Sequence, residues 1–208
     1  MKQEEIERLN SMLEIENMLY DKGYKYICGV DEAGRGPLCG PVVAAAVILK
    51  KGDIIEGVND SKKLSEKKRE KLYEDIMAKA ISVGIGISDV DVIEEINILN
   101  ATKKAMCEAI SNLEIKPEYA LIDGNQGIDI DIAYDTVVKG DLKSESIAAA
   151  SIIAKVTRDR LLREYDKKYP EYGFAKHKGY GTKAHIEAIQ KYGLLPVHRP
   201  SFCSKFVK

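Results

Sequence analysis

Residues 24–49 read YKYICGVDEAGRGPLCGPVVAAAVIL, and this stretch decides the fold. It holds two apolar runs, residues 24–30 and 42–49, whose β-branched and aromatic side chains predict two strands. Residues 31–41 between them are rich in glycine, proline and acidic side chains, which is typical of a turn-rich connection. We expect the second strand to pair with the first.

The flanking sequence predicts further elements on both sides of this stretch. Apolar side chains at helical spacing predict an amphipathic helix over residues 3–21, ending near Gly23. Further strands are expected at residues 81–87, 119–122 and 134–138, and further helices at 65–79, 89–113, 144–168 and 182–192. The helix over 144–168 is apolar on nearly all sides in its first half, so we expect it to be buried against a sheet. The order predicts an α/β fold with a mixed five-stranded sheet flanked by helices.

The composition is that of a soluble globular protein and excludes a disordered or fibrous chain. The 208 residues are 45% hydrophobic and 31% charged. The longest apolar stretches have eight residues, whereas a membrane span needs about 20, and the chain begins without a secretory signal. We therefore expect a cytoplasmic protein with no membrane contact. The cysteines and histidines lack metal-site spacing, and the cysteines (Cys28, Cys39, Cys107 and Cys203) are expected to be reduced thiols.

Charge is distributed unevenly along the chain. The net charge of −1 argues against a dedicated nucleic-acid binder, which is usually strongly basic. However, residues 139–208 carry 15 Lys and Arg against 7 Asp and Glu, a net charge of +8, and residues 1–138 carry −9. An acidic first part therefore precedes a basic second part that could contact phosphates.

Four acidic residues fall where predicted strands end. Asp31 and Glu32 follow the first strand, Asp123 follows the fourth, and Asp141 comes shortly after the fifth. Ligand sites in α/β folds gather beyond the carboxyl ends of strands, and Mg²⁺ and Mn²⁺ prefer carboxylate oxygens. These acids could therefore converge on one metal cluster, although acidic residues also begin ordinary turns.

Three loop segments each admit two interpretations. The glycine-rich run 34–40 matches neither a Walker loop nor the dinucleotide fingerprint, so it is a tight turn or a backbone that approaches a ligand closely. Residues 172–181 mix aromatic, basic and glycine residues, which suits phosphate contacts with stacking or a solvated basic loop. Lys62 and Lys63 lie beside a helix start and could attract an anion or be a solvated charge run.

Several sequence blocks, taken together, resemble the ribonuclease HII family. They appear in the order of the family's motifs and cover about residues 24–202. The blocks are residues 29–37 (GVDEAGRGP), 59–65 (NDSKKLS), 121–124 (LIDG), 139–141 (KGD), 146–159 (SIAAASIIAKVTRD), 177–180 (HKGY) and 198–202 (HRPSF).

This resemblance implies a fold and an activity. The fold is expected to be RNase H-like, with residues 1–208 forming a single catalytic domain and a small C-terminal helical part. Within it we expect an N-terminal helix over residues 1–23 and a substrate-binding segment over about 165–208. The activity implied is an endonuclease that hydrolyses RNA in RNA–DNA hybrids and incises 5′ of single ribonucleotides embedded in duplex DNA. Its products carry a 3′-hydroxyl and a 5′-phosphate.

The resemblance also implies site residues and a cofactor. The catalytic and metal-binding carboxylates would be Asp31, Glu32, Asp123 and Asp141, holding two Mn²⁺ or Mg²⁺ ions roughly 4 Å apart. The turn that reads the ribose 2′-hydroxyl would be Gly34, Arg35 and Gly36. Tyr180 would stack on the sugar next to the junction. Further substrate contacts are expected from Lys62, Lys143 and Lys178.

Two alternatives stay open at this point. The sister family, ribonuclease HIII, normally carries a substrate-binding domain before the catalytic one, and here the predicted first strand begins at residue 24. A catalytically inactive nucleic-acid-binding module is the other alternative, and the presence of all four acids argues against it. The resemblance implies a monomer, and the tail shows no sliding-clamp motif, which leaves a clamp partner open. Neither Glu145 nor the four cysteines has a role that the sequence assigns.

Overall fold

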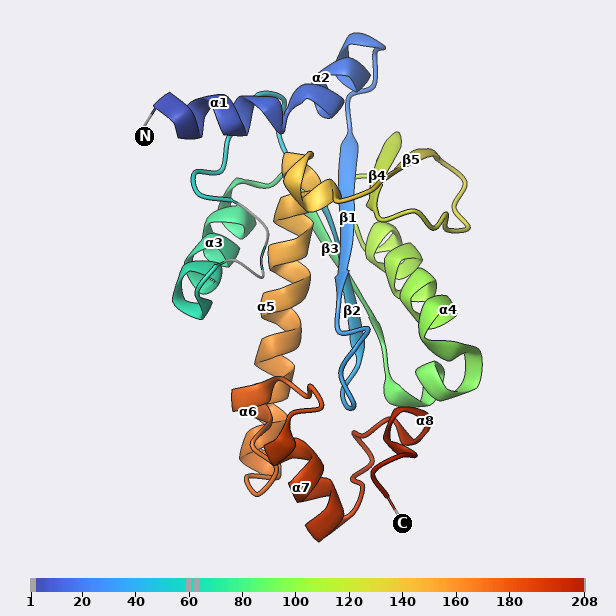
Figure 1. The fold of residues 1–208 in the computed structure, drawn as a ribbon. Helices are drawn as coiled ribbons and strands as arrows, with labels where there is room; N and C mark the ends of the chain where they lie inside the picture. Colours follow the sequence, from blue (N-terminus) through green and yellow to red (C-terminus); the bar gives the residue numbers. More distant parts are fainter. Residues whose placement is uncertain (1–2, 59–60, 62–63, 208) are drawn as a thin grey trace.

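The computed structural model describes residues 3–58, 61 and 64–207 (Figure 1). Within them lies a sheet of five strands in the order β3-β2-β1-β4-β5. The strands are β1 (Ile27–Ala33), β2 (Val42–Ile48), β3 (Ser82–Ser88), β4 (Tyr119–Asp123) and β5 (Ala133–Val137). This is the mixed five-stranded sheet that the sequence predicts.

The direction of the strands sets where the acidic residues gather. Strands β1 and β2 pair antiparallel, as expected, and β2 pairs antiparallel with β3. Strands β1, β4 and β5 run parallel to one another, so their carboxyl ends lie along the same edge of the sheet. The pairing of β1 with β4 stops at Val30 and Ile122, whereas its pairing with β2 continues to Ala33. Asp31 and Glu32 therefore lie within β1 and not beyond its end, which corrects the prediction that they follow the strand.

Helices cover both faces of the sheet (Figure 1). On one face lie α5 (Glu145–Lys168) and α3 (Glu66–Lys79), and the apolar first half of α5 packs on β2, as the sequence predicts. The other face is covered by α4 (Val90–Ser111), whose chain leaves helical geometry at Asn97. Gly29 lets β1 approach α5 closely, because a Cβ there would lie 2.1 Å from the carbonyl carbon of Ser146.

Serine and threonine side chains begin three of these helices where the sequence suggests. Ser65 accepts a hydrogen bond from the amide of Lys68, Ser144 from that of Ile147, and Thr182 from that of His185. Side-chain acceptors of this kind satisfy amides that have no partner in the first helical turn. These N-caps explain why α3, α5 and α7 (Lys183–Tyr192) begin within one residue of the predicted starts.

The C-terminal part forms a small helical unit at one end of the sheet (Figure 1). It contains the predicted helix α7 and two four-residue helices, α6 (Phe174–His177) and α8 (Pro200–Cys203), which the sequence pattern does not reveal. Their apolar side chains pack with Leu38 and Cys39 from the β1–β2 connection. This packing joins the C-terminal segment to the glycine-rich turn.

The prediction of one N-terminal helix is wrong. The chain forms α1 (Gln3–Ser11) and α2 (Glu14–Asp21), separated at Met12 and Leu13. Leu9 and Met12 pack into the cluster beneath α5, whereas Leu19 packs against Ile27 in a different cluster. The two helices therefore pack against different parts of the core. None of the helices among the described residues is long and apolar enough to cross a bilayer.

Candidate active site

Asp31 is a buried carboxylate on β1. Its side chain is 6% exposed, and its Oδ1 accepts a hydrogen bond of 2.7 Å from the amide of Glu32. Burial, followed by the negative charges of Glu32 and Asp123, raises the pKa of Asp31 well above its ordinary value. A hydrogen bond with Ser151 of α5 acts in the opposite direction. Carboxylates thus crowd together where a cation would relieve their repulsion.

Asp123 and Asp141 are connected through the backbone. Asp123 is the last residue of β4, and its Oδ1 accepts a hydrogen bond of 2.6 Å from the amide of Gly140. Gly140 begins the 3₁₀-helix η1 (Gly140–Leu142), which contains Asp141. Lys139 precedes it in the left-handed conformation with φ of 57° and makes the sharp turn out of β5. Asp123 therefore fixes the loop that carries Asp141.

All four predicted carboxylates line one pocket of about 220 Å³. Its wall also holds Gly34, Arg35, Gly36 and Tyr180, which come from the turn and the C-terminal segment singled out in the sequence. A larger pocket of about 450 Å³ lies between the end of α4 and the β4–β5 connection, away from this group. The structure thus brings together residues separated by up to 149 positions in the chain.

The donor set suits a hard divalent cation, because carboxylate oxygens are the ligands that Mg²⁺ and Mn²⁺ prefer. Burial, and after it the charges of Glu32 and Asp123, raise the pKa of Asp31, and a cation bound here would offset both effects. Among the residues that the structure describes, no three His, Cys, Asp or Glu side chains are grouped closely enough to hold a metal ion as they stand.

The glycine-rich turn after β1 is tightly built. Gly34 has φ of +100°, and a Cβ there would lie 2.1 Å from the Nε atom of Arg158, so a side chain is excluded on two grounds. The side chain of Arg35 is about half exposed and lies 3.6 Å from Glu32. A Cβ on Gly36 would be 3.8 Å from the ring of Tyr180. The turn and Tyr180 are therefore neighbours on the pocket wall.

Buried histidines support Tyr180 from below. Nδ1 of His185 donates a hydrogen bond of 2.9 Å to the carbonyl oxygen of Tyr180, and its Nε2 lies 3.1 Å from Nε2 of His198. Burial lowers the pKa of both histidines to about 4, so both are neutral at pH 7. The ring of His177 stacks on that of His185 at 4.3 Å. The Tyr180 side chain itself is 48% exposed and free of this packing.

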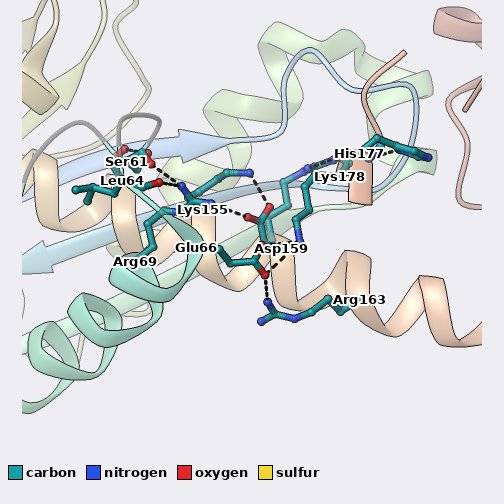
Figure 2. A network of polar contacts seen from close by, with 12 residues as sticks. Ser61, Leu64, Glu66, Arg69, Lys155, Asp159, Arg163, His177 and Lys178 are labelled. Atoms are coloured by element: carbon teal, nitrogen blue, oxygen red, sulfur yellow. Dashed lines mark hydrogen bonds and ion pairs between the residues drawn. The ribbon is translucent and has the colours of Figure 1, made fainter. Parts of the chain in front are cut away.

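The structure describes two of the three lysines that were predicted to contact substrate. Lys143 is exposed and follows η1 outside the pocket lining. The ammonium group of Lys178 lies 3.3 Å from Glu66 of α3, and its side chain is mostly covered (Figure 2). Lys62 lies outside the described residues.

Sequence reasoning singled out the run that contains Lys155 and Arg158 but assigned neither residue to the site. Both line the pocket, together with Ser61 and Ser151. Nζ of Lys155 lies 2.6 Å from Oδ1 of the buried Asp159 (Figure 2). A lysine and an aspartate four residues apart, just after the apolar stretch of α5, are the signal that could have revealed this position.

Arg69 ties the same aspartate to the segment before α3. Its Nη2 lies 3.8 Å from Asp159, and its Nη1 donates to the carbonyl oxygens of Ser61 and Leu64 (Figure 2). The network therefore connects α5 with the segment that precedes α3, next to the pocket.

The sequence of the whole chain matches a known family. The family model described as Ribonuclease HII matches residues 28–205. The chain belongs to the ribonuclease HII family. Ribonuclease HII of Acetivibrio thermocellus is 62% identical over 205 residues, which are 99% of this chain and 80% of that protein. The match decides against the ribonuclease HIII alternative.

Solved structures agree with this assignment. Ribonuclease H2 from Pyrococcus horikoshii superposes with a TM-score of 0.73 and 30% identity, covering 87% of this chain and 96% of the other. Ribonuclease HII from Archaeoglobus fulgidus, solved as a complex with PCNA, gives a TM-score of 0.71 and 29% identity, covering 84% and 93%. The RNase H-like fold expected from the sequence is confirmed. As a ribonuclease HII, the chain is an endonuclease that hydrolyses the RNA of RNA–DNA hybrids with the help of a divalent metal ion.

Proposed function

We propose that this ribonuclease HII also incises duplex DNA on the 5′ side of a single embedded ribonucleotide, leaving a 3′-hydroxyl and a 5′-phosphate. The observation that carries the proposal is the shared pocket. Four carboxylates, the turn of Gly34–Gly36 and the ring of Tyr180 line the same 220 Å³ space. Groups that can act on a phosphate and groups that can contact one ribose are therefore adjacent.

We propose Asp31, Glu32, Asp123 and Asp141 as the catalytic carboxylates that hold two Mg²⁺ or Mn²⁺ ions. Bound at this site, such ions would supply an activated water and neutralise charge on the attacked phosphate and the leaving 3′-oxygen. Asp31 would lie deepest in the site, since it is the most buried of the four. Asp123 would keep Asp141 in place through its bond to Gly140.

Recognition of the ribose falls to the turn and to Tyr180. The 2′-hydroxyl is the group that distinguishes a lone ribonucleotide from its DNA neighbours, so it has to be sensed by close contact. The backbone amides of Gly34, Arg35 and Gly36 offer donors, and the two glycines have no side chain that could cover them. The exposed ring of Tyr180 offers a face for stacking on the adjacent sugar.

The basic C-terminal segment is proposed to bind the duplex. Residues 165–208 contain nine Lys and Arg against three Asp and Glu. We propose that this segment and residues 1–164 form a single domain, because Leu38 and Cys39 pack inside the C-terminal cluster. Lys62, Lys143 and Lys178 would contact phosphates. We propose a monomer. The PCNA complex is a property of the archaeal relative.

Incision of a labelled duplex tests the proposal. A DNA duplex with one ribonucleotide should be cut once, 5′ of that ribonucleotide, in Mn²⁺ or Mg²⁺, and should stay intact in EDTA. An RNA–DNA hybrid of the same length gives the preference between substrates. If the duplex is bound but not cut under conditions where the hybrid is cut, the proposed incision activity is wrong. Binding without cleavage of either substrate would favour the inactive module.

A further inference from the structure

The carbonyl groups of the glycine-rich turn converge on one buried side chain. Arg199 is 0% exposed, although it lies 159 residues away from Gly40 in the chain. Its Nη2 donates to the carbonyl oxygens of Gly34 and Gly40, both at 2.7 Å. Its Nη1 donates to those of Arg35 at 3.0 Å and Pro37 at 2.9 Å, and its Nε donates to Gly40 at 3.0 Å. One guanidinium thus engages four carbonyls of a single turn.

A second buried arginine completes this arrangement. Arg158 is 1% exposed and donates to the carbonyl oxygens of Cys39 at 2.9 Å and Pro41 at 3.0 Å. Its Nη1 donates to the carbonyl oxygen of Lys178 at 3.0 Å, which joins the turn to the segment that carries Tyr180. The planar, rigid fork of arginine suits such multiple acceptors, whereas the single ammonium group of lysine does not.

The consequence concerns the amides of the turn. With their carbonyls directed toward the arginines, Gly34, Arg35 and Gly36 keep N–H groups that donate to no acceptor in the part of the chain that the structure describes. All three residues line the pocket. Backbone N–H groups are strong donors that need a partner, so an oxygen acceptor from a ligand is the complementary group.

The two arginines also carry charge without an acidic partner. Neither forms an ion pair with a described carboxylate. Burial lowers the pKa of Arg199 to about 10, so its guanidinium is still protonated at pH 7. Two buried positive charges beneath the turn favour a ligand with negative charge above it, such as a nucleotide phosphate.

We propose that Arg199 is a positioning residue that determines ribose specificity, because it holds the turn with its amides presented to the 2′-oxygen. This inference rests on the proposed incision at single ribonucleotides. It assigns the discrimination between ribose and deoxyribose to a buried residue that does not line the pocket. Arg158 supports the same turn from its other side.

The Arg199→Lys variant tests this inference in the active enzyme with Mn²⁺. Two quantities are measured: kcat/KM for a duplex with one ribonucleotide, and the inhibition constant of the matching all-DNA duplex. We expect kcat/KM to fall at least tenfold while the inhibition constant changes less than twofold. Ribose recognition would then be lost while DNA binding is kept.

A matched control separates positioning from general loosening. Ile189→Ala removes buried apolar volume from the same C-terminal cluster and removes no hydrogen bond to the turn. This variant should lower the Tm. It should leave the ratio of kcat/KM for the ribonucleotide duplex to the inhibition constant of the all-DNA duplex unchanged. If Arg199→Lys does not fold, Arg158→Lys should show the same split. An equal loss in both quantities, or none, overturns the role of Arg199, whereas a wild-type enzyme that never incises the duplex overturns the proposed function instead.

Discussion

The ammonium group of Lys178 lies 3.3 Å from a carboxylate oxygen of Glu66, the first residue of α3 (Figure 2). The same carboxylate lies 2.6 Å from Arg163 of α5. Lys178 was expected from the sequence to contact substrate phosphate, and here it is engaged by an acidic side chain instead. A phosphate that reaches Lys178 must therefore compete with Glu66 for it.

Glu66→Gln is predicted to strengthen binding of an RNA–DNA hybrid by about two- to fivefold at low salt. Surface ion pairs contribute about 0–1 kcal/mol, so freeing the lysine changes affinity only by a small factor. Fluorescence anisotropy measures the dissociation constant, and the gain should shrink as salt is added. Glu74→Gln is the control, because Glu74 pairs with Arg160 on the same two helices. Weaker binding by Glu66→Gln would show that the pair holds Lys178 in place for phosphate.

Asp31→Asn is predicted to abolish cleavage while raising stability. The substitution removes a charge that burial disfavours and that Glu32 and Asp123 repel, so Tm at pH 7 should rise by about 2–4 °C for each kcal/mol gained. Losing an outer-shell partner of a metal ligand costs up to about 100-fold in activity. Because Asp31 would be a ligand itself, cleavage in Mg²⁺ or Mn²⁺ should fall at least that much. Activity and thermal unfolding of the same preparation measure both effects.

Asp141→Asn should show a comparable loss of activity. Asp135→Asn is the control for both variants, since Asp135 is exposed on β5 and bonds to the Tyr119 hydroxyl outside the pocket. Near-wild-type cleavage by either Asp31→Asn or Asp141→Asn would mean that the metal assignment is wrong.

Much of the sheet and all four carboxylates could be predicted from the sequence, for a physical reason. Strands buried on both faces are apolar along their length, so Asp31 and Asp123 interrupt the pattern where a site begins. The pattern could not show that β1 extends past Asp31, because that extension depends on pairing with β2. Asp141 was predicted because it closely follows the apolar run of the fifth strand, with Gly140 directly before it.

Contacts between distant segments could not be predicted in the same way. Arg199 bonds to backbone carbonyls, which every residue possesses, so its partners leave no signature in the sequence. Glu66 and Lys178 are 112 residues apart, and either could have been solvated. The three histidines lack any regular spacing, yet their rings lie together beneath Tyr180. Such groupings depend on how α6 and α7 pack, which local patterns do not encode.

Glu145 is predicted to make stability depend on pH. This carboxylate is fully buried at the start of α5 and accepts a hydrogen bond from the amide of Ile55. Burial raises its pKa to about 7 from 4.5, the hydrogen bond from Ile55 and the charge of Arg8 oppose this shift, and the charges of Glu16 and Asp53 add to it. Because the folded-state pKa is the higher one, its contribution is present below about pH 4.5 and is lost as pH rises through about 7.

Glu145→Gln should therefore become more stable than wild type as the pH rises from 5 to 8, by about 3 kcal/mol at most. The free energy of unfolding, measured with urea at each pH, gives the difference between the two proteins. Glu14→Gln serves as a control, since Glu14 is exposed on α2 and its substitution should leave the pH dependence unchanged. A constant difference between Glu145→Gln and wild type across this range would contradict the raised pKa.

Tyr180→Ala is predicted to weaken cleavage at an embedded ribonucleotide by about 10- to 100-fold, since stacking on an aromatic ring contributes about 1–3 kcal/mol per base. Tyr180 is 48% exposed, so the Tm should change little. Tyr180→Phe keeps the ring and should retain most of the activity, because the buried histidine below bonds to the backbone and not to the hydroxyl. Tyr192→Ala, which removes a ring of similar exposure outside the pocket, should cleave like wild type. An unchanged rate for Tyr180→Ala would eliminate the stacking role and leave ribose recognition to the turn.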